Sequence, residues 1–215
     1  MTKRFSDRVD AGRQLAGLLE GRVGPDAIVL ALPRGGVPVA AEVARHLQLP
    51  LDVLLVRKLG VPGHEELAMG AIASGGVRVF NEDLLLRLAI EPEQVTRVEQ
   101  AEQRELKRRE QAYRGDRPFP VLKDREILLV DDGLATGASM RAAIEALRQF
   151  QPARILVAVP VAPPETVADL ESEADEVISQ LTPAAFYGVG YWYDDFTQTT
   201  DDEVTALLAK HPEAG

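Results

Sequence analysis

Four short apolar runs, each ended abruptly by charged residues, glycine or proline, constrain the fold of this chain most strongly. They occupy residues 26–32, 51–56, 127–130 and 155–161. Segments with apolar residues at helical spacing precede or separate them, among them residues 13–20, 37–47 and 142–150. Short buried strands that alternate with helices are typical of a parallel sheet covered on both faces. We therefore predict an α/β fold in which a parallel, twisted sheet is flanked by helices.

The remaining segments show other patterns. Residues 91–114 predict a polar helix in which Glu105 and Arg109 are spaced for an ion pair one turn apart. The glycine-rich residues 59–76 predict a mobile loop that leads into a strand at residues 68–73. A further helix is predicted for residues 167–174. No linker-like stretch divides the chain, so we predict one domain over residues 1–215, with a small C-terminal hood over about residues 163–200.

Composition narrows the functional classes. The 215 residues carry a formal net charge of -10, which makes a general nucleic-acid binder an unfavourable prediction. The chain has no cysteine, and this excludes disulfides, thiolate metal sites and cysteine nucleophiles. Neither an apolar signal core nor a run of ~20 apolar residues is found, so we predict a cytoplasmic protein that does not enter membranes.

The stretch ILLVDDGLATGASM, residues 127–140, carries the clearest chemistry. An apolar strand runs into Asp131 and Asp132, and a loop of small residues then leads into a helix. Free amides and the helix dipole at such a turn favour a phosphate group, and Thr136 and Ser139 add hydroxyl donors. The backbone can approach a ligand closely through Gly133, Ala135, Gly137 and Ala138.

A ribose 5-phosphate satisfies both halves of this stretch. Carboxylates accept hydrogen bonds from a vicinal diol and can help to hold hydrated Mg²⁺, while the loop at residues 136–139 takes the phosphate. Two other phosphate-binding motifs are excluded. A Walker A loop requires a lysine that is absent here, and the Rossmann fingerprint requires a GxGxxG spacing where this loop has GxxxG.

This stretch resembles the phosphoribosyl pyrophosphate (PRPP) motif of type I phosphoribosyltransferases. The resemblance implies that Asp131 and Asp132 bind the ribose hydroxyls and Mg²⁺, and that the loop binds the 5-phosphate. The turn Pro33-Arg34-Gly35-Gly36 follows the first strand, where the family has its pyrophosphate loop. The donors expected there are the Arg34 guanidinium and the amides of Gly35 and Gly36.

The family resemblance extends to the second strand. It implies that basic residues beside the pyrophosphate follow this strand, and here these are Arg57 and Lys58. In the implied reaction Arg34 and Lys58 neutralise the departing pyrophosphate, and Asp131 and Asp132 fix the ribose. Residues 59–76 match the flexible catalytic loop of the family in position. Closure of that loop would exclude water and bring in His64, Glu65 and Glu66, although each of these alone is typical of a solvated loop.

The acceptor is less clearly indicated. Ala135 stands where the hypoxanthine-guanine type has a carboxylate, whereas LATG resembles the adenine type, so the resemblance favours a purine over a pyrimidine. Gly133 replaces a branched apolar residue, and this predicts a looser loop. Tyr187 and Asp194 resemble the base-stacking aromatic and the acid of 6-oxopurine enzymes. Trp192 and Tyr193 are alternative stacking residues, and the same aromatics could instead form a packed cluster.

We therefore expect Mg²⁺-dependent transfer of the 5-phosphoribosyl group from PRPP to a nitrogenous base, with release of pyrophosphate. The alternative is a PRPP- or nucleotide-sensing regulator on the same fold, for which the arginine-rich residues 97–114 keep RNA binding open. A PRPP synthetase-like subunit would need an ATP site, and no Walker-type loop is found. Type I enzymes are often dimers, so the resemblance leaves a homodimer open.

Overall fold

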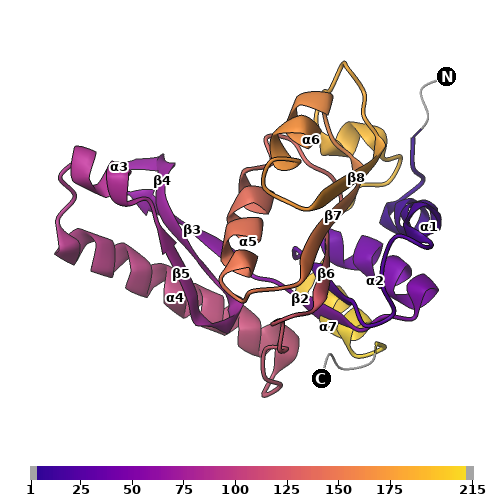
Figure 1. Cartoon of the computed structure of the whole chain (residues 1–215), viewed down its shortest axis with the longest axis horizontal. Helices are drawn as coiled ribbons and strands as arrows, with labels where there is room; N and C mark the ends of the chain where they lie inside the picture. The colour runs from indigo at the N-terminus through magenta and orange to yellow at the C-terminus, as the bar shows by residue number, and fades with distance from the viewer. Residues whose placement is uncertain (1–3, 212–215) are drawn as a thin grey trace.

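The central sheet confirms the predicted α/β architecture. The computed structural model describes residues 4–211 and shows a five-stranded sheet in the order β2-β1-β6-β7-β8 (Figure 1). Every neighbouring pair in this sheet is parallel. Its strands are β1 (Ile28–Ala31), β2 (Leu51–Val53), β6 (Glu126–Val130), β7 (Arg154–Val161) and β8 (Glu176–Leu181).

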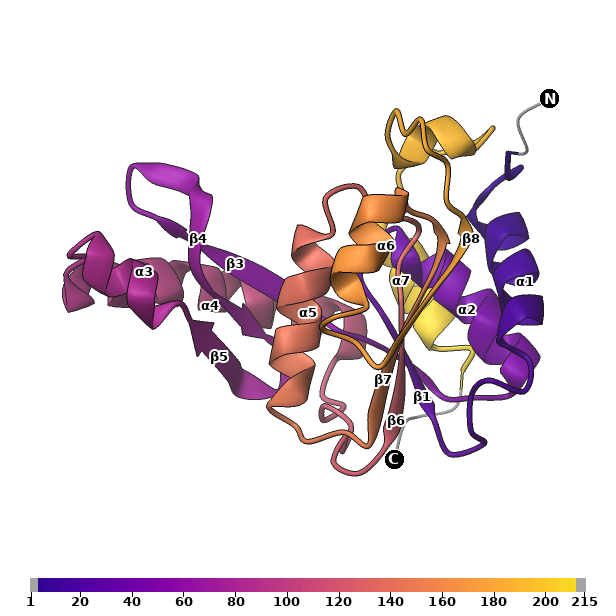
Figure 2. The same cartoon turned by 45° about the horizontal axis from the view of Figure 1, so that its top comes forward.

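Helices cover both faces of this sheet (Figure 2). They are α1 (Arg8–Leu19), α2 (Gly36–Leu47) and α7 (Asp201–Leu208) on one face, and α5 (Ala138–Arg148) and α6 (Pro164–Leu170) on the other. Side chains of the inner strands β1, β6 and β7 alternate between the two cores. Val29 and Leu128 belong to the core with α1, α2 and α7, whereas Ile28 and Leu129 belong to the core with α5. Burial on both faces explains why these strands are continuous apolar runs.

The order of the strands creates a crevice at one edge of the sheet. From β1 the chain moves outward to β2, whereas from β6 it moves in the opposite direction to β7 and β8. The point of reversal therefore lies between β1 and β6, which are hydrogen-bonded neighbours. In open α/β sheets ligands bind outside the carboxyl ends of the strands at such a point.

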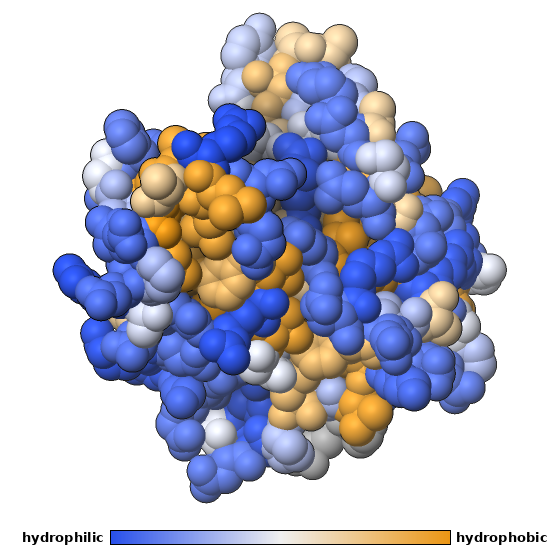
Figure 3. Space-filling view, turned by 60° about the vertical axis from the view of Figure 1, so that its left-hand side comes forward, coloured by the Kyte–Doolittle hydropathy of each residue, from blue (hydrophilic) through white to orange (hydrophobic). Residues whose placement is uncertain are grey.

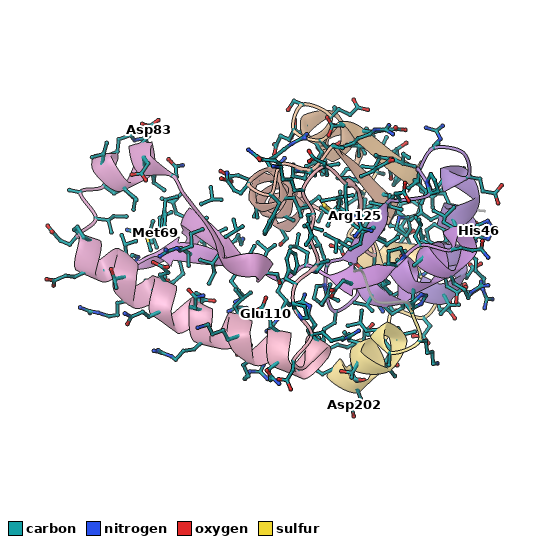
Figure 4. All side chains as sticks on the ribbon, turned by 60° about the horizontal axis from the view of Figure 1, so that its bottom comes forward. His46, Met69, Asp83, Glu110, Arg125 and Asp202 are labelled. Atoms are coloured by element: carbon teal, nitrogen blue, oxygen red, sulfur yellow. The ribbon has the colours of Figure 1, made fainter. Side chains whose placement is uncertain are left out.

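A second unit, which we call the arm (residues 56–114), projects from the central sheet (Figure 1). It consists of an antiparallel sheet in the order β3-β4-β5, backed by helices. Met69 lies between this sheet and α4 (Figure 4) and is fully buried. The elements of the arm are β3 (Val56–Val61), β4 (His64–Ala73), the short helix Ser74–Gly76, β5 (Val77–Phe80), α3 (Glu82–Arg87) and α4 (Pro92–Arg114).

The arm corrects three predictions. The mobile loop predicted for residues 59–76 is a β-hairpin whose turn contains Gly63 at φ 79°. The second strand ends at Val53, and Arg57 and Lys58 lie inside β3 rather than after β2. Leu59 and Val61 are buried in β3 while Lys58 is exposed. Lys58 faces outward from a one-sided antiparallel strand, whereas Arg57 is half-buried on the face that carries Leu59 and Val61. The two charges therefore do not mark the end of a buried strand.

The free end of the arm leaves large apolar side chains exposed. Leu67, Leu86 and Leu88 are 43%, 78% and 44% exposed. Figure 3, which brings this side of the molecule forward, shows apolar residues gathered on the surface there. The polar helix α4 has the predicted ion pair, with Arg109 Nε 2.7 Å from Glu105 Oε1. No helix within residues 4–211 has both the length and the apolar character that crossing a bilayer requires.

Residues 163–200, predicted as a hood, divide into two parts. The first part supplies α6 and β8, which belong to the main layers. The second part, which we call the tail segment (residues 182–200), contains the short helix Val189–Trp192 and lies against the N-terminal residues. Phe5 N donates to Trp192 O over 2.8 Å, and Asp194 N donates to Phe5 O over 2.8 Å. Contacts with residues at the other end of the sequence therefore hold the tail segment in place.

Candidate functional site

The turn after β1 and the acid pair after β6 meet at the point of reversal. Leu32 N donates to Val130 O over 3.0 Å, and the turn then passes directly over the acids. A β carbon on Gly35 would lie 2.1 Å from Asp132 Oδ2, and one on Gly36 would lie 2.9 Å from Val130 O. Only glycine permits this approach, so the structure brings the two predicted glycines and the two predicted acids together.

The acid pair is electrostatically strained. Asp132 N donates to Asp131 Oδ1 over 2.8 Å, which orients the first carboxylate. Burial, and then the negative charge of Asp132, raise the pKa of Asp131 well above its usual value. Burial also raises the pKa of Asp132, against the opposing effect of Arg8. Two carboxylates that resist ionisation side by side would gain stability from a cation or from hydroxyl donors.

Arg8 is a member of the site that the sequence analysis missed. Its Nε donates to Asp132 Oδ2 over 2.9 Å, and the two side chains are only 11% and 14% exposed. The same guanidinium donates to Thr197 O and lies 3.9 Å from the centre of the Phe196 ring. Arg8 therefore links α1, the acid pair and the tail segment, across 124 residues of sequence that offer no local signal.

The loop between β6 and α5 is supported from behind. Thr166 Oγ1 donates to Ala135 O over 2.7 Å, and Arg141 donates to Thr136 O. α5 begins at Ala138, directly after Gly137 at φ 73°. Thr136 and Ser139 remain exposed, and the first amides of a helix have no acceptor within it. The predicted phosphate-binding residues are thus presented together on one rigid turn.

Gly133 is closely packed, which contradicts the expected loosening of the loop. It is buried at φ 155°, and a β carbon would lie 2.6 Å from Val189 Cγ1. The neighbouring Leu134 N donates to Val161 O over 2.9 Å. A branched side chain would displace the tail segment from the acid pair, so glycine fixes the loop here.

Two basic residues line a crevice beside the acid pair, which has a volume of about 150 Å³. It is lined by Leu32, Pro33, Leu54, Leu55, Val56, Arg57, Arg109, Asp131 and Ser139. The predicted Arg57 is thus placed next to Asp131. Arg109, which the sequence indicated only as part of a solvated helix, reaches the same crevice from α4.

The other two predicted basic residues lie close to this crevice without lining it. Arg34 belongs to the turn that supplies Pro33, and its Nη1 is 3.7 Å from Asp201 Oδ1. Lys58 is exposed in a wider hollow of about 480 Å³, which also contains Arg57 and Ser139. His64, Glu65 and Glu66 are exposed at the start of β4, and Glu65 lines the same wider hollow.

The predicted acceptor residues are not assembled around the acid pair. Tyr187 is 74% exposed and has its ring 5.2 Å from that of Tyr191. Asp194 lies 3.4 Å from Arg4 Nε, on the N-terminal segment. Trp192 and Tyr193 are buried in a cluster with Phe5, as the packed-cluster alternative predicted. Tyr193 still reaches the site, because its hydroxyl donates to Asp132 O over 2.6 Å.

Comparison with known proteins identifies a family. The family described as "Phosphoribosyl transferase domain" matches residues 10–194. Two Mycobacterium tuberculosis proteins are each 49% identical over 206 residues, or 96% of this chain. They are MT0597 of strain CDC 1551 and Rv0571c of strain H37Rv, both provisionally named phosphoribosyl transferases. The chain spans only 46% of their length.

Two solved structures share the fold of this chain. The crystal structure of TT1426 from Thermus thermophilus is 44% identical, with a TM-score of 0.87 over 97% of this chain and 99% of that chain. AQ2163 from Aquifex aeolicus shares 11% identity with a TM-score of 0.52, over 95% of this chain and 86% of that chain. At that identity the second likeness concerns the fold alone.

Proposed function

This chain belongs to the phosphoribosyl transferase domain family, and we propose that it transfers the 5-phosphoribosyl group of PRPP to a nitrogenous base and releases pyrophosphate. The observation that carries this proposal is the meeting of the acid pair with the Gly35-Gly36 turn at the point of reversal. A ribose diol, a phosphate and a pyrophosphate each need different binding groups. Candidate groups for all three lie next to one another at this point of the sheet.

Each part of PRPP has a complementary group. Asp131 and Asp132 accept hydrogen bonds from the ribose hydroxyls. The amides at the start of α5, with the hydroxyls of Thr136 and Ser139, bind the 5-phosphate. The Gly35 amide and the guanidiniums of Arg34 and Arg57 surround the pyrophosphate. The amide of Gly36, also predicted as a donor, is already used within the turn, where it donates to Leu32 O over 3.1 Å. Lys58 adds positive charge from the wider hollow.

The acid pair fits Mg²⁺ as a cofactor. Within residues 4–211 no cluster of three or more acids or histidines could hold a metal on its own. Mg²⁺ commonly uses one or two carboxylates and completes its shell with water and substrate phosphate oxygens. Asp131 and Asp132 would hold it, and a bound Mg²⁺ supplies charge neutralisation for both the acids and the pyrophosphate.

The chemical step is a substitution at C1 of the ribose. The bond from C1 to the pyrophosphate oxygen breaks, and its electron pair leaves with pyrophosphate. A lone pair of the acceptor nitrogen forms the new bond to C1, and the surplus proton of the base passes to water, since Ala135 offers no carboxylate. Asp131 and Asp132 stabilise the cation-like ribose, while the arginines stabilise the leaving group.

The acceptor we propose is a purine, because the LATG loop is similar to that of the adenine type. Tyr187 and Tyr191 provide the exposed aromatic surface of the tail segment on which a base could stack. The cytoplasm, where PRPP and free bases occur together, is the compartment that suits this activity.

A second candidate function is a PRPP- or nucleotide-sensing regulator. One specific observation favours it: Asp132 already pairs with Arg8, while Tyr187 packs on Tyr191 and Asp194 pairs with Arg4. A protein that senses PRPP needs the donor half of the site and not the acceptor half. Both functions require the same donor binding, so they differ only in whether bound PRPP then reacts with a base.

Calorimetry with Mg²⁺ and PRPP tests the shared part. We expect the Asp131→Asn, Asp132→Asn double variant to lose more than about 100-fold in PRPP affinity, because each position loses a charge-assisted contact. Asp169→Asn, an exposed acid on α6, is the matched control and should bind normally. Unchanged binding by the double variant, with folding confirmed by circular dichroism, would rule out the proposed site.

Pyrophosphate release then separates the two functions. The wild-type protein is incubated with Mg²⁺, PRPP and a panel of purines and pyrimidines. Release that depends on one base identifies the enzyme and its acceptor. Tight PRPP binding without release for any base, together with a salt-sensitive shift of RNA, identifies the regulator instead.

A further inference from the structure

The crevice beside Asp131 contains a positive charge from an unexpected element. Its polar lining consists of Arg57 from β3, Arg109 from α4, and Asp131 and Ser139 from the acid pair and loop. At about 150 Å³ it is smaller than the ~300 Å³ of a pocket for a whole ligand. It therefore suits one charged group of a larger ligand whose remainder lies outside.

The end of α4 is fixed to the central sheet, so Arg109 is held rigidly. Arg114 is 5% exposed, and its guanidinium donates to Asp52 Oδ1 over 3.2 Å and to Val53 O over 2.9 Å. Tyr113 donates to Asp201 Oδ1 on α7 over 2.5 Å. Figure 4 shows Glu110 of α4 at the end of the helix that approaches Asp202 of α7. Arg109 lies one turn before these anchors.

Both crevice arginines are oriented by acids on successive turns of α4. Arg57 Nε donates to Glu102 Oε2 over 2.6 Å, and Arg109 Nε donates to Glu105 Oε1 over 2.7 Å. Within residues 4–211 the two Nη atoms of Arg109 donate no hydrogen bond. A guanidinium held through Nε still presents two donors in a plane, the geometry that matches two oxygens of a phosphate.

A third guanidinium converges on the same region. Arg34 comes from the turn after β1 and lies 3.7 Å from Asp201, the acid that also accepts from Tyr113. Burial and this hydrogen bond raise the pKa of Tyr113 to about 12, and the positive charges of Arg109 and Arg34 partly oppose that rise. Arg34, from the turn after β1, and Tyr113, one turn after Arg109 on α4, thus meet at the same Asp201 carboxylate.

We infer that Arg109 contacts the pyrophosphate group of bound PRPP through its Nη atoms, which makes α4 part of the donor site. The crevice lies between the Pro33 turn, which we assign to the pyrophosphate, and Asp131. Ser139, which we assign to the 5-phosphate, also lines it, so the ligands of the test must separate the two phosphate groups. This inference rests on the proposed function. The inference adds Arg109 to the residues that contact the substrate, and this residue comes from α4 of the arm rather than from the edge of the central sheet.

Calorimetry on the full chain with three ligands tests the inference, each in the presence of Mg²⁺. Arg109→Gln should weaken binding of PRPP and of inorganic pyrophosphate by about 10- to 100-fold, the usual effect of losing a charge-assisted hydrogen bond. Binding of ribose 5-phosphate, which lacks the pyrophosphate, should change by less than twofold. Arg109→Lys keeps the charge without the planar fork and should give an intermediate loss.

Arg108→Gln is the matched control. Arg108 is the next residue on α4, also pairs with Glu105, is 61% exposed and does not line the crevice. It should bind all three ligands like the wild type. Equal PRPP affinity for Arg109→Gln and the wild type would overturn the inference alone, as would an equal loss for ribose 5-phosphate. If the wild type itself binds no PRPP, the proposed function fails and the inference fails with it.

Discussion

The two halves of the candidate site are built in different ways. On the donor side, Asp131, Asp132, Gly35 and Gly36 follow directly from two neighbouring buried strands, and hydrogen bonds within the sheet fix their positions. On the acceptor side, the tail segment depends on contacts with Phe5, Arg4 and Arg8, far away in sequence. Donor recognition is thus a property of the fold, whereas acceptor recognition depends on how a peripheral segment is held.

Gly133 joins the two halves, so its replacement should have the largest effect. Gly133→Val forces a β-branched residue to φ 155° and drives its side chain into Val189 of the tail segment. Backbone strain and overpacking each cost about 1–3 kcal/mol, and we expect a loss of roughly 3–5 kcal/mol in the free energy of unfolding. Urea denaturation measures this loss.

Gly21→Val is the control for the Gly133 substitution. Gly21 also has a positive φ, 73°, but a β carbon there would meet nothing within 4 Å. It should show the cost of strain without the cost of overpacking, about 1–3 kcal/mol. Equal losses for the two variants would mean that the donor loop and the tail segment are not coupled through Gly133.

Arg8 connects the halves by charge, and its loss should have the next largest effect. Arg8→Ala leaves Asp132 without its partner in a site where both side chains are nearly buried. We expect a loss of about 2–3 kcal/mol in the free energy of unfolding, somewhat below the cost of breaking a fully buried pair. Adding Asp132→Asn should recover a large part of it, since the uncompensated charge is then removed.

Arg13→Ala is the control on the same helix. Arg13 pairs with Glu42 but is 63% exposed, and exposed pairs contribute about 0–1 kcal/mol. If Arg8→Ala is no more costly than Arg13→Ala, or if Asp132→Asn gives no recovery, the Arg8–Asp132 pair does not hold the tail segment to the donor side.

The acid pair of the donor side should also lower the stability of the ligand-free protein, and a bound ligand should remove this cost. Because the pKa of Asp131 is raised in the folded state, the native protein binds more protons than the unfolded chain between the ordinary aspartate pKa, ~3.9, and the raised value. Stability therefore falls as pH rises through this window and stays lower above it. Asp131→Asn removes this penalty, and its amide oxygen can still accept from Asp132 N.

We expect Asp131→Asn to be more stable than the wild type at pH 7 by roughly 0.5–2 kcal/mol, the common gain on relaxing a functional site. The two proteins should become equal at the acid end of the window. Chemical denaturation between pH 4 and pH 8 measures both. A difference that does not vary with pH would contradict the charge explanation, and added Mg²⁺ with PRPP should stabilise only the wild type.

The donor side could be predicted from the sequence because the patterns that identify it are local. The four apolar runs, the acid pair and the small-residue loop each lie within a few neighbouring residues, and all four runs begin or end within a few residues of β1, β2, β6 and β7. β8 escaped prediction because an edge strand such as Glu176–Leu181 mixes polar and apolar residues. The two consecutive charges of β3, Arg57 and Lys58, resemble the end of a buried strand, and the glycine-rich hairpin resembles a loop.

Arg8 and Arg109 could not be found by the same reasoning. Arg8 precedes the apolar spacing that predicted a helix at residues 13–20, and its partner is 124 residues away. Arg109 has a local partner, Glu105, which is sufficient to explain it as part of a solvated helix. Only the docking of α4 onto the central sheet turns that side of the helix toward Asp131. Tertiary contacts, not motifs, determine these two roles.

Tyr187 should give the smallest effect on stability and the sharpest test of the acceptor side. Its side chain is 74% exposed and its ring lies 5.2 Å from that of Tyr191, so Tyr187→Ala should change the free energy of unfolding by less than about 0.5 kcal/mol. If a base stacks on it, the KM for the acceptor should rise by about 2- to 10-fold while the KM for PRPP stays constant.

Tyr191→Ala is the control, because Tyr191 also packs on Trp192 and under Arg4. An acceptor KM that only Tyr191→Ala changes would move the stacking surface to Tyr191. No change in either variant would mean that the tail segment stabilises the donor side through Tyr193 and Arg8 and takes no part in binding the base.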